Sequence, residues 1–255
     1  MRTVPPKTVV VTQSNYIPWR GFFDLVRRAD ELILLDSVQY TRRDWRNRNA
    51  IVTKSGLNWL TIPVSVKGKF DQSIKAVKIV DPAWAERHIR AIDYNYRRAG
   101  SFEEVAPWLF AGLRRAAGLT KLSDVNRYLV ESVCAVLSIG TTVTSCVDVL
   151  PQSELQSLGS SERIARLCEA VGGTQYLSGP AAHSYLDVSC FSRRKIAVRW
   201  MSYDGYTQYS QCWPGFSPNV SIIDTLLNQG FDASKRLIRP AGTLLCDAQA
   251  PRSSK

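Results

Sequence analysis

The sequence predicts an α/β protein with a Rossmann-like, mostly parallel β-sheet and a central helical insertion. Two short and wholly apolar runs, residues 9–11 and 32–35, have the composition of strands that are buried on both faces. The segment between them carries apolar residues at helical spacing, so the chain opens with the order strand, loop, helix, strand. A long stretch of helical periodicity at residues 82–139 then separates this opening from the later strands.

The N-terminal elements follow from local signals. Residues 9–11 are β-branched and predict the first strand. Pro18 favours the start of a helix, because proline fits the first helical turn, and we expect this helix to include residues 22–29. After the strand at 32–35, residues 58–64 predict another strand. Residues 74–80 alternate apolar and basic side chains, which predicts a half-exposed strand.

The later elements alternate between helix and strand. Within residues 82–139, an aromatic or apolar side chain or a histidine recurs every four residues, at Trp84, His88, Ile92 and Tyr96. The rest of the pattern predicts strands at 142–144, 174–177 and 197–201, a helix at 160–171 closed by Gly172 and Gly173, and a helix at 220–228 that ends at Gly230.

No repeat and no low-complexity linker divides the chain. We therefore expect one α/β domain over residues 1–239, with the helical insertion at 82–139 and a disordered tail at 240–255. No apolar run approaches the length of a membrane span, and the N-terminal residues lack a signal-peptide core. These features predict a cytoplasmic protein with no membrane partner.

The charge balance bears on possible partners. The formal net charge is +11, a field that attracts polyanions such as tRNA, a phosphorylated carrier or a nucleotide-linked substrate. The arginine doublets are dispersed along the chain, so an ordinary solvated surface is the alternative explanation.

The cysteines give no sign of a metal site. There are six, widely spaced, without a C-x-x-C pair or a nearby histidine cluster. We expect most of them to be small core hydrophobes, with Cys212 as an alternative thiol nucleophile because it lies among aromatic residues. The sequence predicts no metal and no bound cofactor.

The first candidate ligand-binding segment follows the first predicted strand. Gln13, Asn15 and Tyr16 stand at its carboxyl end, where ligands bind in open parallel sheets. Amides and a phenol there can hydrogen-bond a ligand, and Gly21 would let the helix approach the strand closely. The loop has neither the G-x-G-x-x-G nor the P-loop fingerprint. A plain loop that caps a helix is the alternative.

The second candidate segment follows the second predicted strand. Asp36 ends that strand, so it should open on the same crevice as Gln13 and Asn15. Arg46 and Arg48 are spaced to grip a carboxylate or phosphate. The candidate substrate-binding side chains in this segment are Gln39, Tyr40, Asp44, Trp45, Arg46, Asn47 and Arg48. A solvent-facing cluster of salt bridges is the alternative.

Three further positions carry candidate chemistry. His88 is one of two histidines, and its unperturbed pKa suits a general base, although a buried structural histidine is the alternative. Ser178 lies in a Ser-Gly-Pro turn that could present donors to an anion or be purely structural. Tyr209 and Gln211 form a later polar block, beside a segment that could simply be core.

Together these blocks resemble the WbqC-like protein family. The resemblance extends from about residue 9 to residue 230 and is densest near the N-terminus. The matching blocks are Gln13-x-Asn15-Tyr16-x-Pro18-Trp19-x-Gly21-x-Phe23-Asp24, Asp36-x-Val38-Gln39-Tyr40, residues 44–49, the helix from Trp84 through His88 to Tyr96, residues 176–179, Tyr209-x-Gln211, Phe216-x-Pro218 and residues 221–224. Ser14 departs from the proline common in the family, and the sequence after Gly179 is less glycine-rich.

The resemblance implies an enzyme of glycoconjugate or natural-product biosynthesis. Our first hypothesis is a transferase that forms an amide on an amino group of a nucleotide sugar or other small amine, with an aminoacyl-tRNA or acyl-CoA donor. In this hypothesis His88 or Asp36 is the base, Arg46 and Arg48 clamp phosphate or carboxylate, and Gln13, Asn15 and Asn47 orient the substrates.

Two other hypotheses stay open. One is an ATP-dependent ligase or nucleotidyltransferase-like enzyme, since the opening is similar to that of nucleotidylyltransferases and class I aminoacyl-tRNA synthetases. The His-x-Gly-His motif of those enzymes is absent here. The other is a non-catalytic protein that binds nucleotide sugars or RNA.

Overall fold

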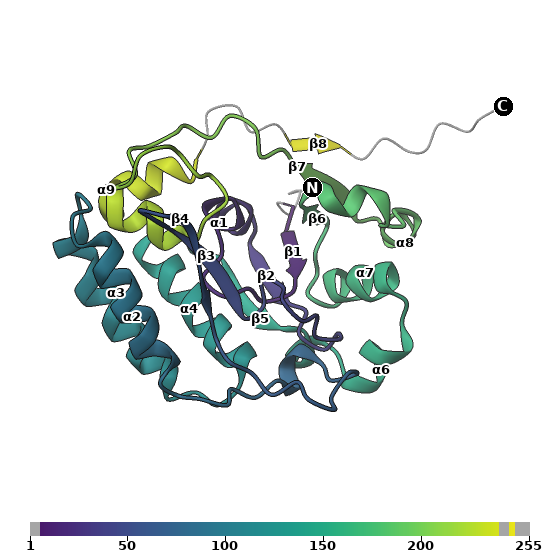
Figure 1. The fold of residues 1–255 in the computed structure, drawn as a ribbon. Helices are drawn as coiled ribbons and strands as arrows, with labels where there is room; N and C mark the ends of the chain where they lie inside the picture. The colour runs from purple at the N-terminus through teal and green to yellow at the C-terminus, as the bar shows by residue number, and fades with distance from the viewer. Residues whose placement is uncertain (1–5, 240–244, 248–255) are drawn as a thin grey trace.

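The centre of the structure is a six-stranded sheet (Figure 1). The computed structural model describes residues 6–239 and 245–247. The strand order is β5-β2-β1-β6-β7-β8, in which the first five strands are parallel and β8 pairs antiparallel with β7. The strands are β1 (Thr8–Thr12), β2 (Glu31–Leu34), β5 (Thr142–Ser145), β6 (Gln175–Ser178), β7 (Ala197–Met201) and β8 (Leu245–Asp247). The predicted α/β fold with a mostly parallel sheet is confirmed.

Helices cover both faces of this sheet (Figure 1). Along β1, Val10 belongs to one apolar core while Val9 and Val11 belong to the other, and Leu32 and Ile33 of β2 divide in the same way. Side chains alternate between the faces of a strand, so a strand packed on both sides needs apolar residues at every position. This explains the unbroken apolar runs in the sequence.

The order in which the chain adds strands creates a reversal in the sheet. The helix α1 (Arg20–Arg27) joins β1 to β2, and β5 is then added on the outer side of β2. The chain returns through the helix α7 (Ser160–Ala170) to place β6 on the opposite side of β1. The carboxyl ends of β1 and β6 therefore flank the point at which the direction of winding reverses, the usual place for a ligand in such sheets.

The segment between β2 and β5 holds a hairpin and the helical insertion. The hairpin consists of β3 (Arg48–Thr53) and β4 (Gly56–Thr61), and the helices are α2 (Trp84–Tyr96), α3 (Phe102–Ala117) and α4 (Leu122–Val136). The predicted helical insertion is confirmed. The sequence predicts β4 but not β3, whose first residues belong to the polar candidate segment.

One predicted strand is wrong. Residues 74–80 contain the short 3-10 helix η1 (Ile74–Ala76), followed by two isolated bridges instead of a ladder. Ile74 and Val77 are fully buried. Their spacing of three residues matches the period of a 3-10 turn, which places both on one face.

The remaining helices are short except for the last. They are α5 (Cys146–Val149), α6 (Gln152–Ser157), η2 (Pro180–Ser184), α8 (Ser189–Ser192) and α9 (Ile222–Leu237). The predicted helix end at Gly230 is confirmed, because α9 consists of two helical segments that meet at this residue, and the second segment was not predicted. Gly230 makes the break with φ of 75°, and a Cβ there would lie 2.6 Å from a carboxylate oxygen of Glu104. Glycine is therefore required at the break.

The end of the chain is described only in part. The tail was predicted to be disordered from residue 240, but Leu245–Asp247 forms β8, and residues 240–244 and 248–255 lie outside the described residues. Within residues 6–239 and 245–247, none of the helices combines the length and the apolar character that a membrane crossing requires.

Candidate functional site

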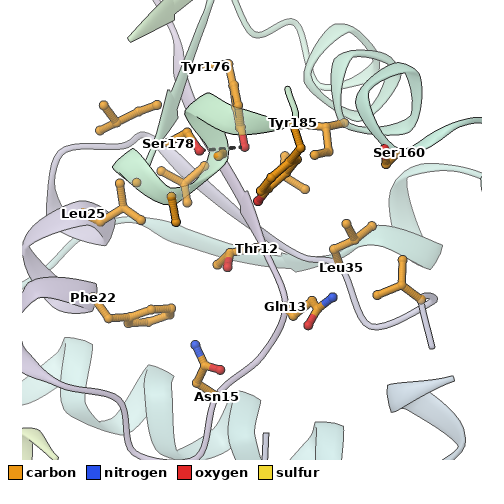
Figure 2. A pocket seen from close by; sticks show the side chains of 18 of the residues that line it. Thr12, Gln13, Asn15, Phe22, Leu25, Leu35, Ser160, Tyr176, Ser178 and Tyr185 are labelled. Atoms are coloured by element: carbon orange, nitrogen blue, oxygen red, sulfur yellow. Dashed lines mark hydrogen bonds between the residues drawn. The ribbon is translucent and has the colours of Figure 1, made fainter. Parts of the chain in front are cut away.

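A cavity of about 440 Å³ opens at the carboxyl ends of β1 and β6 (Figure 2). We call it the switch-point cavity, because it lies where the strand order reverses. Its volume is in the range of small-molecule sites. The side chains of Gln13 and Asn15 come from the loop after β1, and Ser178 ends β6.

The walls of this cavity contain both polar and apolar side chains. Figure 2 shows Thr12, Gln13, Asn15, Ser160, Ser178 and Tyr185 around the opening, with Phe22, Leu25 and Leu35 beside them. The Tyr176 hydroxyl donates a hydrogen bond to Ser178 Oγ at 3.3 Å, which holds the end of β6 in place. A ligand here can bury apolar surface and still find several hydrogen-bond partners.

Among the described residues, the charged side chains in the cavity wall are those of Arg46 and Arg163. Arg46 donates to Asn15 Oδ1 and pairs with Asp44, whose carboxylate oxygen is 3.4 Å away. Burial lowers the pKa of Arg46, while Asp44 and Asp36 oppose this shift, so the guanidinium stays charged. Its Nε atom is buried without a hydrogen-bond partner among the described residues.

The second arginine is Arg163, in the first turn of α7. Its Nε and Nη2 atoms donate to the carbonyl oxygens of Leu155 and Leu158, so the side chain also fixes the entry to the helix. No side chain caps the N-terminus of α7, where Ser160 lines the cavity. Free amide groups and the helix dipole make such an end favourable for an anion.

No carboxylate, histidine, lysine or cysteine of the described residues lines the switch-point cavity. Asp36, predicted as a base, is buried at the end of β2, where its Oδ1 accepts the Ser14 amide at 2.9 Å. Burial raises the pKa of Asp36, whereas the Ser14 hydrogen bonds and Arg46 act to lower it. Asp36 therefore ties the loop after β1 to β2 and does not reach the cavity surface.

His88, the other predicted base, is a buried structural histidine. It is 5% exposed, and its two ring nitrogens lie 2.8 Å from Tyr16 Oη and 3.2 Å from the Thr61 carbonyl oxygen. The ring must donate to the carbonyl, so Nδ1 accepts from Tyr16 and the imidazole is neutral. Burial is the main cause that lowers the pKa of His88 to about 4. The fully buried Tyr16 likewise does not line the switch-point cavity.

Most other side chains of the second candidate segment hold the loop itself. Asn47 donates to the Ile62 carbonyl at 2.8 Å, and Gln39 donates to the Phe70 carbonyl at 3.1 Å. Tyr40 is buried, Asp44 accepts the Trp45 amide and pairs with Arg46, and Arg48 stacks on Trp59. The candidates that line the switch-point cavity are Gln13, Asn15, Arg46 and Ser178.

A second cavity of about 400 Å³ adjoins the first. We call it the aromatic cavity, because Trp19, Trp45 and Trp59 line it, and it shares Asn15 and Trp19 with the switch-point cavity. Trp45 is a site residue predicted from the sequence, whereas Trp59, which stands on the hairpin, is not. The explanation proposed for Gly21 is also corrected. A Cβ there would lie 2.4 Å from the indole of Trp19, so this glycine makes room for a cavity wall rather than for the strand.

Tyr209 and Gln211 lie elsewhere. They line a shallow hollow with Phe216 and donate to a buried carboxylate, Asp224, at 2.7 and 2.8 Å. The Tyr96 hydroxyl donates to the other oxygen of Asp224 at 2.6 Å. Burial raises the pKa of Asp224, and these three donors oppose that shift. The network anchors residues 209–217 to α9 and α2.

The sequence blocks therefore do not converge on one site. Asp36 and His88 are buried, Arg46 lines the switch-point cavity and Gln211 lines the separate hollow. The sequence predicts Ser160 and Arg163 only as part of a helix and does not mark them, or Tyr185, as wall residues. No local signal marks them, because only the pairing of β6 with β1 brings them beside the N-terminal loop.

The fold and the cavity define a doubly wound α/β protein with a candidate ligand site at the reversal of strand order. The chain belongs to the WbqC-like protein family, whose model matches residues 13–236. It is similar to the uncharacterized protein Rv1507c of Mycobacterium tuberculosis, with 47% identity over 227 residues, which are 89% of this chain and 96% of the relative. No solved structure matches the chain. The family resemblance seen in the sequence is confirmed.

Proposed function

We propose that this chain is a transferase that forms an amide. It moves an acyl or aminoacyl group from a phosphate-containing donor, such as an aminoacyl-tRNA or an acyl-CoA, to the amino group of a nucleotide sugar or natural-product intermediate. The observation that carries the proposal is the pair of adjoining cavities, one cationic and one aromatic, that share Asn15 and Trp19. A transfer needs its donor and acceptor held in contact, and the two cavities together offer room for both, with the reacting atoms beside these two side chains.

The donor's phosphate belongs in the switch-point cavity. Arg46 and Arg163 supply positive charge there, and the uncapped N-terminus of α7 supplies amide donors. The net charge of +11 favours the approach of a polyanionic donor. This assignment replaces the predicted clamp of Arg46 with Arg48, because Arg48 stacks on Trp59 and does not line this cavity.

The chemistry needs donors for an oxyanion and a route for one proton. The neutral amine attacks the donor's carbonyl carbon, and the tetrahedral oxyanion can be stabilised by the amide of Asn15 or Gln13 and by Arg46. Collapse breaks the bond to the leaving oxygen or sulfur, which takes up the proton released by the amine. This route uses neither His88 nor Asp36 as a base, in agreement with their burial.

Product analysis tests the proposal. The purified chain is incubated with a pool of amino sugars linked to nucleotides and either aminoacyl-tRNA or acyl-CoA, and the products are analysed by mass spectrometry. We expect a product heavier by the transferred group, without consumption of ATP. Arg46→Gln should lose this product, whereas Arg90→Gln, the same charge change at an exposed position on α2, should keep it. Product formation that requires ATP and Mg²⁺ would favour the ligase hypothesis instead.

A non-catalytic binding protein for nucleotide sugars or RNA is the second candidate. The observation that favours it is the lack of a carboxylate, histidine or cysteine among the described residues that line the two cavities. It predicts the same loss of ligand affinity in Arg46→Gln but no product with any donor.

A further inference from the structure

We propose that the aromatic cavity binds a nucleobase, as part of the phosphate-containing ligand whose phosphate contacts Arg46 in the adjoining cavity. The placement of the phosphate rests on the proposed function, and the recognition of the base stands on observations of its own. The base belongs either to a free nucleotide or to the single-stranded end of an RNA.

The walls of the aromatic cavity suit a planar ring. The side chains of Trp45 and Trp59 are 44% and 43% exposed and lie together, with ring centroids 5.4 Å apart and planes inclined by 43°. Trp19 forms the wall shared with the switch-point cavity. Two neighbouring exposed indoles leave a large apolar surface in water, which is typical of a binding site. Bases stack on such rings whatever their sequence.

The hairpin positions the Trp59 side of this platform. Trp59 of β4 faces Ala50 of β3 in the antiparallel register, and both residues line the cavity. The small side chain of Ala50 leaves space opposite the indole. The guanidinium of Arg48, which does not line the cavity, lies 4.3 Å from the ring centroid of Trp59 and supports the indole from outside.

The polar groups of the cavity are uncharged amides. No charged side chain of the described residues lines it, and Asn15, Asn49 and Asn219 do. The amide of Asn49 is already used, since it donates to the Tyr16 and Ile17 carbonyls and accepts the Ala50 amide. That leaves the amide of Asn219, together with the side-chain N–H groups of Asn15, whose oxygen already accepts from Arg46, to bind a ligand. Asparagine presents one donor and one acceptor, the pair that matches the edge of adenine.

The position of the shared residues links the two cavities. Asn15 lines both cavities and accepts a hydrogen bond from Arg46, and Trp45 precedes Arg46 in the chain. A base against Trp45 and Trp59 therefore places the attached sugar near Asn15 and a phosphate near Arg46. An uncharged, flat group with polar edges joined to an anion is the chemical description of a nucleotide.

Titration calorimetry with defined probes tests the inference. We expect adenosine 5′-monophosphate (AMP) to bind the intact chain more tightly than ribose 5-phosphate, which lacks the base. Trp45→Ala and Trp59→Ala should each weaken AMP binding by about 5- to 150-fold, the range measured for loss of base stacking. Trp45→Phe should keep most of the affinity. Tyr94→Ala is the matched control, because this exposed aromatic side chain on α2 lines neither cavity.

Three comparisons decide between the claims. Equal affinity for AMP and ribose 5-phosphate, or unchanged AMP affinity in Trp45→Ala and Trp59→Ala, would overturn the base site. Unchanged AMP affinity in Arg46→Gln, together with weakened binding in the tryptophan variants, would support the base site and contradict the phosphate placement of the proposed function. The trinucleotide cytidine-cytidine-adenosine decides the source of the base. If it binds at least tenfold more tightly than AMP, the base belongs to an RNA end, and if its binding is equal or weaker, the base belongs to a free nucleotide.

Discussion

Replacement of His88 by asparagine should remove one pH-dependent part of the protein's stability. The folded chain holds this imidazole neutral, with a pKa of about 4, because burial disfavours the charged form. In the unfolded chain the pKa is 6.5. Between these values the unfolded chain binds a proton that the folded chain does not. The contribution of His88 to the free energy of unfolding is therefore fully present above pH 6.5 and is lost as the pH falls toward 4.

The size of the effect follows from the two pKa values. Linkage gives a loss of about 2 kcal/mol in the free energy of unfolding between pH 8 and pH 5. The buried carboxyls of Asp36 and Asp224 act in the opposite direction, because their pKa values are raised by burial and their contribution grows as the pH falls. The wild-type pH profile alone mixes these effects, so the comparison with His88→Asn is needed. The Asn side-chain oxygen can still accept the hydrogen bond of Tyr16.

Urea unfolding of both proteins at pH 5 and pH 8 measures the difference. We expect the wild type to lose about 2 kcal/mol more than His88→Asn over this interval. His88→Asn should also be less stable than the wild type at pH 8, because the bond to the Thr61 carbonyl is lost. Parallel pH dependence of the two proteins would refute the reasoning, since it would mean that the imidazole of the folded chain takes up its proton as freely as in the unfolded chain.

The other predictions concern three further residues, Gly21, Asp224 and Cys212. Gly21→Ala should destabilise the fold by about 1–3 kcal/mol and weaken ligand binding, because the new Cβ would overlap the Trp19 indole that lines both cavities. Gly112→Ala is the control, since a Cβ there meets open space within α3, and it should raise the free energy of unfolding in urea by about 0.5–1 kcal/mol. Asp224→Ala should cost about 3–5 kcal/mol in the same assay, because it removes a buried carboxylate that accepts from Tyr96, Tyr209 and Gln211 and leaves the buried Tyr96 hydroxyl without its acceptor. The exposed Asp232→Ala should leave the unfolding midpoint unchanged. Cys212→Ala should retain ligand affinity and product formation, since burial raises the thiol pKa to about 11 and so excludes a thiolate nucleophile at neutral pH; complete loss of product with retained affinity would contradict this.

The sequence predicts the parts of the fold that local burial determines. Strands β1 and β2 were found because packing on both faces requires unbroken apolar runs, and the helical insertion was found because Trp84 and Ile92 return on one helix face. The segment 74–80 was assigned wrongly, because its alternation comes from a 3-10 turn followed by isolated bridges. Short apolar patterns do not distinguish these structures.

The sequence predicts only those cavity residues that follow the end of a predicted strand. Gln13, Asn15 and Arg46 follow the carboxyl ends of strands that are close in the sequence, and they line the switch-point cavity. Arg163 comes from α7, which reaches the cavity only because β6 pairs with β1. The environment of His88 also depends on a distant contact, since its role is set by the Tyr16 hydroxyl 72 positions earlier. A local sequence pattern shows neither which strands pair nor which distant side chains are in contact.

A thermal-shift screen tests the central claim that the switch-point cavity is the binding site for a phosphate-containing ligand. The purified chain is screened against nucleotides, nucleotide sugars, coenzyme A thioesters and bulk tRNA, since a ligand that binds only the folded state raises the melting temperature. We predict a rise with at least one of these compounds that is lost in Arg46→Gln and kept in Arg90→Gln. A rise that survives Arg46→Gln unchanged, or no rise with any of the compounds, would contradict the claim.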